Sequence, residues 1–243
     1  MSMPHDSWAW VYDEVYEKSF GNFYVNLTKQ TLSVVDELLE PKSAILDVGA
    51  GTGRLAIPFS ERGHQVTAID ASKPMLDVLR SKDPASNINT IHSRLQDLEL
   101  AKQFDFVCCV FSVFCYLTTE EELDAAINAI CRHTKQNGKI LIDITALGSF
   151  AGINYQSEDL IRTVTVEEVD LDQHLFRYIE TIRNSGPEGV QQFEDEFLIK
   201  YWDHNLILQK FSDLGLNGHV NLTDHFFGSG ARYYLVDRSI TNF

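Results

Sequence analysis

The sequence predicts an α/β fold in which a doubly wound, mostly parallel sheet carries an inserted antiparallel sheet. Three observations lead to this prediction. Short apolar segments alternate with helical segments over residues 43–144, which is typical of parallel βαβ units. After residue 150 the apolar residues recur with period two, as they do in antiparallel strands. A helix and two strands over residues 202–237 then complete the chain.

The N-terminal region is predicted to form a helical cap over residues 1–42. Residues 7–40 combine helical spacing of apolar residues with an entry rich in tyrosine, tryptophan and phenylalanine, and Pro41 stops the run. We therefore expect this cap to precede the first strand and to lie outside the main sheet.

The alternating region is predicted to contain five strands, over residues 43–48, 65–70, 88–92, 104–111 and 139–144. The helices between them have recognisable starts. Ser72 can cap one of them with Pro74 in its first turn, and Thr119 with Glu122 forms a capping-box pair. A further helix is expected over residues 54–62, ending at Gly63.

The insertion is predicted to be an antiparallel sheet over residues 151–201, attached to a main domain made of residues 43–150 and 202–243. Its strands are expected at 160–169, 174–183 and 190–201, with a turn over 184–189. Asp203 can cap the helix that follows. The two closing strands are expected at about 216–222 and 231–237.

Length and charge restrict the function. The chain has 243 residues, 44% of them apolar, which suits one domain with an insertion. Acidic residues outnumber basic ones by 35 to 20, and no basic stripe suited to nucleic acid is visible. No apolar run reaches the ~18 residues of a membrane span, and no secretory signal is visible. We expect a cytoplasmic monomer or homodimer that binds neither nucleic acid nor a membrane.

The four cysteines point to buried, reduced thiols. Cys108, Cys109, Cys115 and Cys131 form no CxxC pair and have no zinc-type spacing. No cluster of histidine, cysteine and carboxylate residues suggests a metal along the sequence, so no metal site is expected.

A glycine-rich turn is the strongest functional signal. Residues 47–54 read Asp-Val-Gly-Ala-Gly-Thr-Gly-Arg between a predicted strand and a predicted helix. Glycines at such a turn let the backbone approach a ligand closely. Asp70 ends the next strand, where a carboxylate can accept hydrogen bonds from a ribose diol. This combination indicates a ligand that contains a nucleoside.

The spacing of the glycines separates the candidate ligands. A dinucleotide fingerprint reads GxGxxG, whereas here the third glycine comes one residue early and Arg54 occupies the fingerprint position. A P-loop would need Gly-Lys-Ser/Thr, which is absent. An NAD-linked oxidoreductase is thereby disfavoured, and a non-catalytic nucleoside-binding protein of the same fold remains an alternative to an enzyme.

These segments resemble the class I S-adenosylmethionine-dependent methyltransferases. ILDVGAGTGR looks like their first motif, VTAID like their second, and LQDL followed by FDFVCCVFSVFCYL like the region that covers adenine and leads to the active site. GARYYLV resembles their antiparallel seventh strand. The resemblance implies a Rossmann-like, seven-stranded sheet with an antiparallel last strand, and S-adenosylmethionine as cofactor.

The resemblance also implies a set of cofactor-binding residues. The loop glycines should line the methionine and ribose, Asp70 should bind the ribose hydroxyls, and Gln96 and Asp97 should lie beside adenine. The full expected set is Tyr24, Asp47, Gly49, Ala50, Gly51, Gly53, Arg54, Asp70, Ala71, Leu95, Gln96, Asp97, Cys109, Val110 and Phe111.

The methyl acceptor is expected to be a small molecule that is methylated on nitrogen or oxygen. The opening Tyr12-Asp13-Glu14-Val15-Tyr16 and the segment 111–117 are similar to amino-sugar N-methyltransferases and glycine N-methyltransferase. In the amino-sugar enzymes the position of Tyr116 is commonly histidine. Aromatic faces suit a sulfonium cation, so we expect Tyr12, Tyr16 and Tyr116 to be the catalytic residues.

Overall fold

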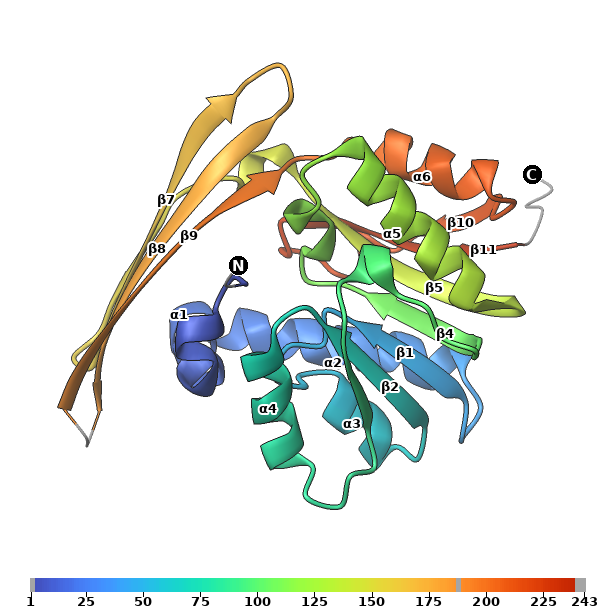
Figure 1. Ribbon diagram of the computed structural model, residues 1–243, viewed down its shortest axis with the longest axis horizontal. Helices are drawn as coiled ribbons and strands as arrows, with labels where there is room; N and C mark the ends of the chain where they lie inside the picture. The colour runs from blue at the N-terminus through green and yellow to red at the C-terminus, as the bar shows by residue number, and fades with distance from the viewer. Residues whose placement is uncertain (1–2, 187–188, 239–243) are drawn as a thin grey trace.

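The computed structural model describes residues 3–186 and 189–238. Figure 1 shows two sheets: a main sheet flanked by helices, and a long antiparallel blade that stands beside it. The N-terminal helix α1 (Tyr12–Phe20) lies between the blade and the main domain (Figure 1). Three parts of the chain, the main domain, α1 and the blade, thus meet on this side of the molecule.

The main sheet has seven strands in the order β10-β11-β5-β4-β1-β2-β3. Strands β3, β2, β1, β4 and β5 pair in parallel, whereas β11 is antiparallel to both of its neighbours. This confirms the predicted fold class. The strand bounds are Ala44–Val48 (β1), Gln65–Asp70 (β2), Asn89–His92 (β3), Phe104–Cys109 (β4), Thr134–Thr145 (β5), Gly218–Asn221 (β10) and Ala231–Asp237 (β11).

Both faces of the sheet are covered, which explains why its central strands are apolar throughout. All five residues of β1 are buried, and neighbours along it join opposite cores: Ile45 packs with α2, α3 and α4, and Leu46 with α5 and α6. The helix bounds are Asn22–Leu38 (α2), Ala56–Glu61 (α3), Lys73–Lys82 (α4), Glu120–His133 (α5) and His204–Asp213 (α6).

The predicted helix starts are confirmed. The Ser72 hydroxyl accepts from the Met75 amide at 3.2 Å, and the Thr119 hydroxyl accepts from the Glu122 amide at 3.2 Å. Asp203 Oδ1 accepts from the amides of Asn205 and Leu206. These caps satisfy amides that have no partner inside the helix.

Some predicted elements differ from the structure. The strand predicted over 139–144 runs from Thr134 to Thr145. The helical run over 7–40 is divided into a 3₁₀ segment, Asp6–Val11, and the helices α1 and α2, because Gly21 takes a φ of 53° between them. The strand predicted over 104–111 ends at Cys109, since Phe111 and Ser112 both have positive φ and turn the chain.

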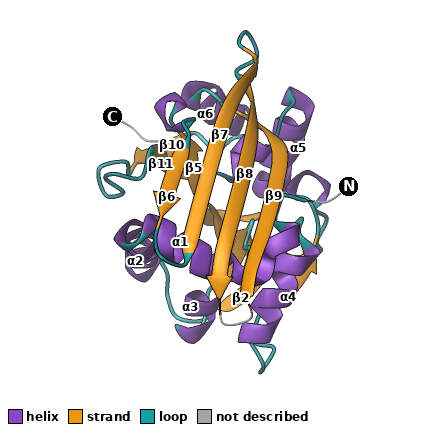
Figure 2. Cartoon of the chain, turned by 90° about the vertical axis from the view of Figure 1, so that its left-hand side faces the viewer, coloured by secondary structure: helices purple, strands orange, loops and turns teal. Residues whose placement is uncertain are grey.

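The blade contains four antiparallel strands in the order β6-β7-β8-β9, with β6 (Ile153–Gln156) as an additional strand that the sequence pattern did not indicate. The other three are Leu160–Asp170 (β7), Leu175–Gly186 (β8) and Gly189–Lys200 (β9). Figure 2 views the blade face-on, with the helical domain behind it. Residues 184–186, predicted as part of a turn, belong to β8, and Gly189 begins β9, whereas Pro187 and Glu188 of that predicted turn lie outside the described residues.

All four cysteines are buried as free thiols, as predicted. No helix within residues 3–186 and 189–238 is both long and apolar enough to cross a membrane.

Candidate active site

A cavity of about 430 Å³ opens at the carboxyl ends of β1, β2 and β4 and continues under the blade. It lies where β1 sits between β2 and β4, the point at which ligands bind in open α/β sheets. Its lining comes from residues 3–5, α1, α2, the glycine loop, the loop after β4, and the inner face of the blade. One continuous space therefore reaches from the nucleoside-type loop to the inserted sheet.

The glycine loop is fastened to the end of β2. The Gly51 amide donates to Asp70 Oδ2 at 2.8 Å, and the Ser72 amide donates to Asp70 Oδ1 at 2.7 Å. Burial raises the pKa of Asp70, and these two amide hydrogen bonds oppose that rise. The Asp70 carboxylate is thus held at the rim of the cavity with lone pairs left for a ligand.

The three loop glycines serve different purposes. All have positive φ: 67° at Gly49, 54° at Gly51 and 92° at Gly53. A Cβ at Gly49 would lie 2.6 Å from Val113, and one at Gly53 would lie 2.9 Å from Leu79, so both are needed for packing. A Cβ at Gly51 would meet no atom of the described residues within 4 Å. Because Gly51 has no side chain, the part of the cavity beside it remains free of protein atoms.

A buried carboxylate with one unpaired oxygen, within the described part of the chain, lies beside the loop. Asp47 is 3% exposed, and its Oδ2 has no hydrogen-bond partner among the described residues. Burial raises the pKa of Asp47 to about 7, opposed by the charge of Arg54. An orphaned carboxylate oxygen that lines a cavity is suited to a cationic amine. The methionine end of S-adenosylmethionine carries such a group, so the residues present fit this cofactor.

Arg54 forms one side of the cavity with two aromatic rings. Its guanidinium carbon lies 5.3 Å from the ring centre of Tyr24 and 4.9 Å from that of Phe111, and its Nη1 donates to the Thr28 hydroxyl at 3.1 Å. These contacts hold the cation against ring faces. Phe111 reaches this position because positive φ values at Phe111 and Ser112 turn the chain at the end of β4.

The structure gathers fifteen of the eighteen predicted site residues around the cavity. The lining residues are Tyr12, Tyr16, Tyr24, Asp47, Gly49, Ala50, Gly51, Arg54, Asp70, Ala71, Leu95, Gln96, Val110, Phe111 and Tyr116. Three others lie outside the lining. Gly53 packs against Leu79, Cys109 is fully buried inside the sheet, and Asp97 is exposed on the outer side of its 3₁₀ turn.

The aromatic wall consists of tyrosines from the N-terminal cap. The rings of Tyr12 and Tyr16 are stacked, with centres 4.2 Å apart, and Tyr16 also meets Tyr24 and Phe111 edge-on. Burial raises the pKa of both Tyr12 and Tyr16 well above the ordinary value for tyrosine. Both phenols therefore remain protonated and neutral at physiological pH.

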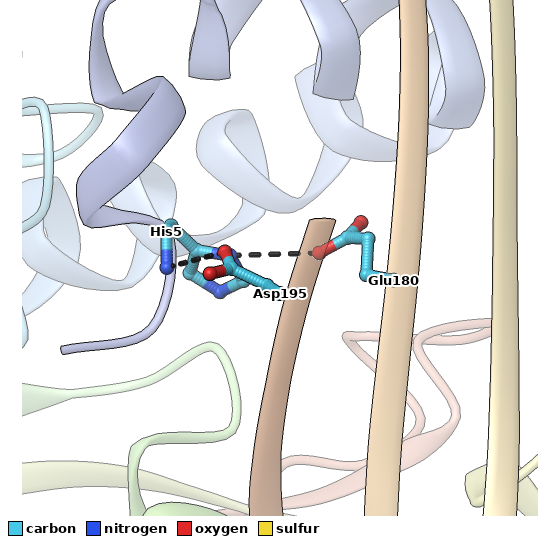
Figure 3. Close-up of side chains that lie close together, drawn as sticks. All are labelled: His5, Glu180 and Asp195. Carbon is cyan, nitrogen blue, oxygen red and sulfur yellow. Dashed lines mark hydrogen bonds and ion pairs between the residues drawn. The ribbon is translucent and has the colours of Figure 1, made fainter. Parts of the chain in front are cut away.

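Sequence reasoning missed a polar cluster at the blade end of the cavity. Glu180 and Asp195 face each other across β8 and β9, and His5 joins them from the N-terminal segment (Figure 3). His5 Nδ1 lies 3.5 Å from Glu180 Oε2 and 3.7 Å from Asp195 Oδ2. The three residues have ligand types that metals use, although their separation along the chain hid the cluster.

The cluster is balanced by donors from two other elements. Arg162 Nε donates to Glu180 Oε1 at 2.6 Å, and both side chains are fully buried. Asp195 Oδ2 accepts from the His5 amide at 2.8 Å and from the Trp8 indole at 2.7 Å. Like charges directly opposite each other destabilise a sheet, so these donors explain how the pair is tolerated.

One further buried acid, Asp143, also escaped the sequence analysis. It lines the cavity from β5, and both carboxylate oxygens accept from the Ser112 amide at 3.0 Å. Burial raises its pKa to about 6.

Of these missed residues, Asp195 had a usable signal in the sequence. It lies between Phe193 and Phe197 on the apolar side of its strand, where an acid is unusual.

Comparison with known proteins relates this geometry to one family. A family model described as a methyltransferase domain matches residues 45–138. The cypemycin N-terminal methyltransferase of a Streptomyces species is 33% identical over 106 residues, which cover 44% of this chain and 43% of that enzyme. The chain thus spans less than half of that relative's length.

Longer matches come from enzymes whose names include amino sugars. The dTDP-3-amino-3,4,6-trideoxy-alpha-D-glucopyranose N,N-dimethyltransferase of Streptomyces venezuelae is 26% identical over 215 residues, covering 85% of this chain and 88% of that one. The structure of SAM-bound CalS10, an amino pentose methyltransferase from Micromonospora echinaspora, has the same fold. The match covers 94% of this chain and 97% of that one, with a TM-score of 0.74 and 18% identity.

The matched segment 45–138 contains the glycine loop, Asp70 and the turn after β4, which form the nucleoside side of the cavity. The strand order, the antiparallel β11 and the fit of the buried Asp47 to a cationic amine agree with that match. Residues 45–138 thus match a methyltransferase domain, and the chain is similar in sequence to sugar N,N-dimethyltransferases and in fold to CalS10.

Proposed function

We propose that this protein transfers a methyl group from S-adenosylmethionine to a nitrogen or oxygen of a small molecule bound under the blade. The observation that carries the proposal is the single cavity that joins the glycine loop to a chamber of tyrosines and buried polar groups. Its volume of about 430 Å³ is within the ~300–1,000 Å³ of small-molecule sites.

On the cofactor side, Asp70 is the residue proposed to hold the ribose, and Asp47 the amino group of the methionine end. The cofactor supplies an electrophilic methyl group on a sulfonium centre. Leu95 and Gln96 line the cavity where adenine is expected. Arg54, kept against Tyr24 and Phe111, limits the space on the opposite side.

On the acceptor side, alignment and exclusion of water are the main contributions of the chain. Alignment of two reactants can supply ~7–11 kcal/mol of the barrier. Tyr12 and Tyr16 form an apolar, uncharged wall, and Tyr116 faces the cavity from the loop after β4. The N-terminal segment and the blade close the chamber together, because the Trp8 indole N–H donates a hydrogen bond to Asp195 of β9. Such closure keeps water from the reacting pair.

A binding experiment and an activity screen test the proposal together. The protein should bind S-adenosylmethionine and its demethylated product in a calorimeter, and NAD should give no heat of binding. A library of small amines and alcohols should then contain acceptors that cause release of the demethylated product. Binding of the cofactor without turnover on any acceptor would instead support a non-catalytic nucleoside-binding protein, and binding of NAD alone would overturn the assignment.

A further inference from the structure

The imidazole of His5 is held between two groups that fix where its proton lies. His5 is 6% exposed, and its Nε2 lies 3.2 Å from the Tyr116 hydroxyl. Its Nδ1 lies 3.5 Å from Glu180 Oε2. Within the described part of the chain neither Nδ1 nor Oε2 has a hydrogen-bond partner, although both are buried. One proton placed between these two atoms satisfies both of them.

Arg162 decides which of the two atoms carries that proton. Its guanidinium is fully buried, lies over the rings of Tyr16 and Phe20, and donates to Glu180 Oε1 at 2.6 Å. A buried cation needs a paired anion, so Glu180 is ionised and can only accept. The proton therefore lies on His5 Nδ1, and Nε2 is left with a lone pair.

The position of the proton on His5 also fixes the orientation of the Tyr116 hydroxyl. A bare Nε2 accepts the Tyr116 O–H, and the lone pairs of the phenol oxygen are then free for a ligand. Tyr116 lines the cavity, and the residue as a whole is 39% exposed. Its oxygen thus faces the acceptor chamber as a hydrogen-bond acceptor and not as a donor.

We propose that His5 is a positioning residue, locked by Glu180 and Arg162, that makes Tyr116 the acceptor for an N–H of the substrate, so that the protein methylates primary and secondary amines. This inference rests on the proposed function and names its substrate class. An N–H of a neutral amine that donates to Tyr116 leaves the nitrogen lone pair free to point at the methyl group. The N–C bond would form as the C–S bond breaks, the demethylated cofactor would keep that electron pair, and the resulting ammonium would lose a proton to water. A tertiary amine has no N–H in its neutral form, so methylation ends at that stage.

The chamber does not activate alcohols in the same way. Burial raises the pKa of Tyr116 well above its ordinary value, and burial together with Arg162 lowers the pKa of His5 to about 3. At physiological pH the Tyr116 phenol therefore stays protonated, and the His5 imidazole binds a further proton only weakly. Neither group can thus act as an effective base. A neutral amine needs no base before attack, whereas an alcohol is a poor nucleophile without one.

The backbone at His5 provides the variant that tests this role. His5 has a φ of 68° and a ψ of 2°, in the left-handed region that asparagine also tolerates. His5→Asn therefore keeps the local conformation and removes Nε2. We expect kcat/KM for an amine acceptor to fall about three- to tenfold, the loss of one neutral hydrogen bond, with cofactor affinity little changed and with a lower Tm, because Glu180 Oε2 loses its buried partner.

The double variant separates positioning from general packing. Tyr116→Phe should cause a similar loss, and adding His5→Asn to it should lower kcat/KM by no more than about twofold, since both changes remove the same interaction. His64→Asn is the matched control, because His64 is also buried but lies outside the cavity lining. The positioning role would be overturned if the double variant lost as much kcat/KM as the two single variants combined, or if His64→Asn lost as much as His5→Asn.

A spectroscopic measurement keeps the inference separate from the proposed function. Nitrogen-15 correlation spectra of the histidine side chains, assigned with His5→Asn, should show His5 as the neutral tautomer protonated on Nδ1, and Glu180→Gln should change that signal. This result stands even if no acceptor is found. The opposite tautomer in the wild type would contradict the inference, as would a zinc or manganese ion that binds at His5 and is lost in Glu180→Gln.

Discussion

The Gly51 amide donates to Asp70 Oδ2 at 2.8 Å, so the glycine loop after β1 and the end of β2 form one unit at the rim of the cavity. Because the second oxygen of Asp70 holds the Ser72 amide at the start of α4, this one carboxylate organises three segments. Its removal has consequences for the local structure as well as for the ligand.

Asp70→Ala should weaken cofactor binding at least tenfold. A hydrogen bond to a charged group contributes about 1.5–3 kcal/mol, and the ribose would lose its charged acceptor. Titration calorimetry with the demethylated cofactor measures the change. The variant should also melt at a somewhat lower temperature, since two amides lose their partner. Unchanged affinity in a folded variant would refute the role given to Asp70.

Gly51→Ala should bind the cofactor more weakly, and its loss of folding stability alone should not account for that weaker binding. The φ of 54° places a side chain in the left-handed region, which costs about 1–2 kcal/mol, and the added methyl group projects into the space proposed for the cofactor. Gly63→Ala is the matched control, since Gly63 has a φ of 83°, equally open surroundings and no place in the lining.

Both glycine variants should show similar losses in the free energy of unfolding by denaturant titration. Only Gly51→Ala should lose binding. Equal binding by the two variants would show that the loop is a structural turn.

The affinity for the cofactor should fall as the pH decreases below about 7. In the free protein the pKa of Asp47 is raised to about 7 by burial. The ionised form accepts the ammonium group of the cofactor, so bound Asp47 has a lower pKa, and binding releases a proton at acidic pH. Calorimetry from pH 5.5 to 8 should show this trend in the wild type, whereas Asp47→Asn should bind weakly with little pH dependence.

The stability of the free protein should respond to Asp47 in the opposite direction. The pKa of Asp47 in the folded protein lies above the ordinary aspartate value of 3.8, so the folded state binds more protons between about pH 4 and pH 7. Its contribution to the free energy of unfolding therefore decreases as the pH rises through that range. The difference between wild type and Asp47→Asn isolates this contribution, and a difference that is constant with pH would contradict the assigned pKa.

The N-terminal segment should become more protected from hydrogen exchange when the demethylated cofactor is added. Residues 5–20 line or cover the cavity, and Gly21 with a φ of 53° separates them from α2. Exchange over α5, which packs in the opposite core, is the internal reference. Identical exchange of residues 5–20 with and without ligand would show that the segment is fixed packing.

Local signals in the sequence were sufficient for most of the main domain. The predicted strand at 65–70 matches β2, and the caps at Ser72, Thr119 and Asp203 are formed, because each depends on residues within a few positions of one another. The pairing of the Gly51 loop with Asp70 could also be predicted, since the two lie at the ends of consecutive strands.

The acceptor side could not be predicted in the same way. His5, Glu180 and Asp195 meet only because the register of β8 with β9 places the two acids opposite each other and the N-terminal segment folds against them. Positive φ values at Phe111 and Ser112 shortened the strand predicted over 104–111, and neither residue type indicates such a turn. Long-range contacts of this kind leave little trace in spacing or periodicity.

The most direct test of the central claim is transfer of a deuterated methyl group from labelled S-adenosylmethionine to small acceptors, followed by mass spectrometry. We expect primary and secondary amines to gain the labelled methyl group with the wild type, and the rate with Asp70→Ala to fall at least tenfold at a subsaturating cofactor concentration. The account would be contradicted if no amine or alcohol gained the label while the protein bound the cofactor, or if Asp70→Ala transferred it at the full rate.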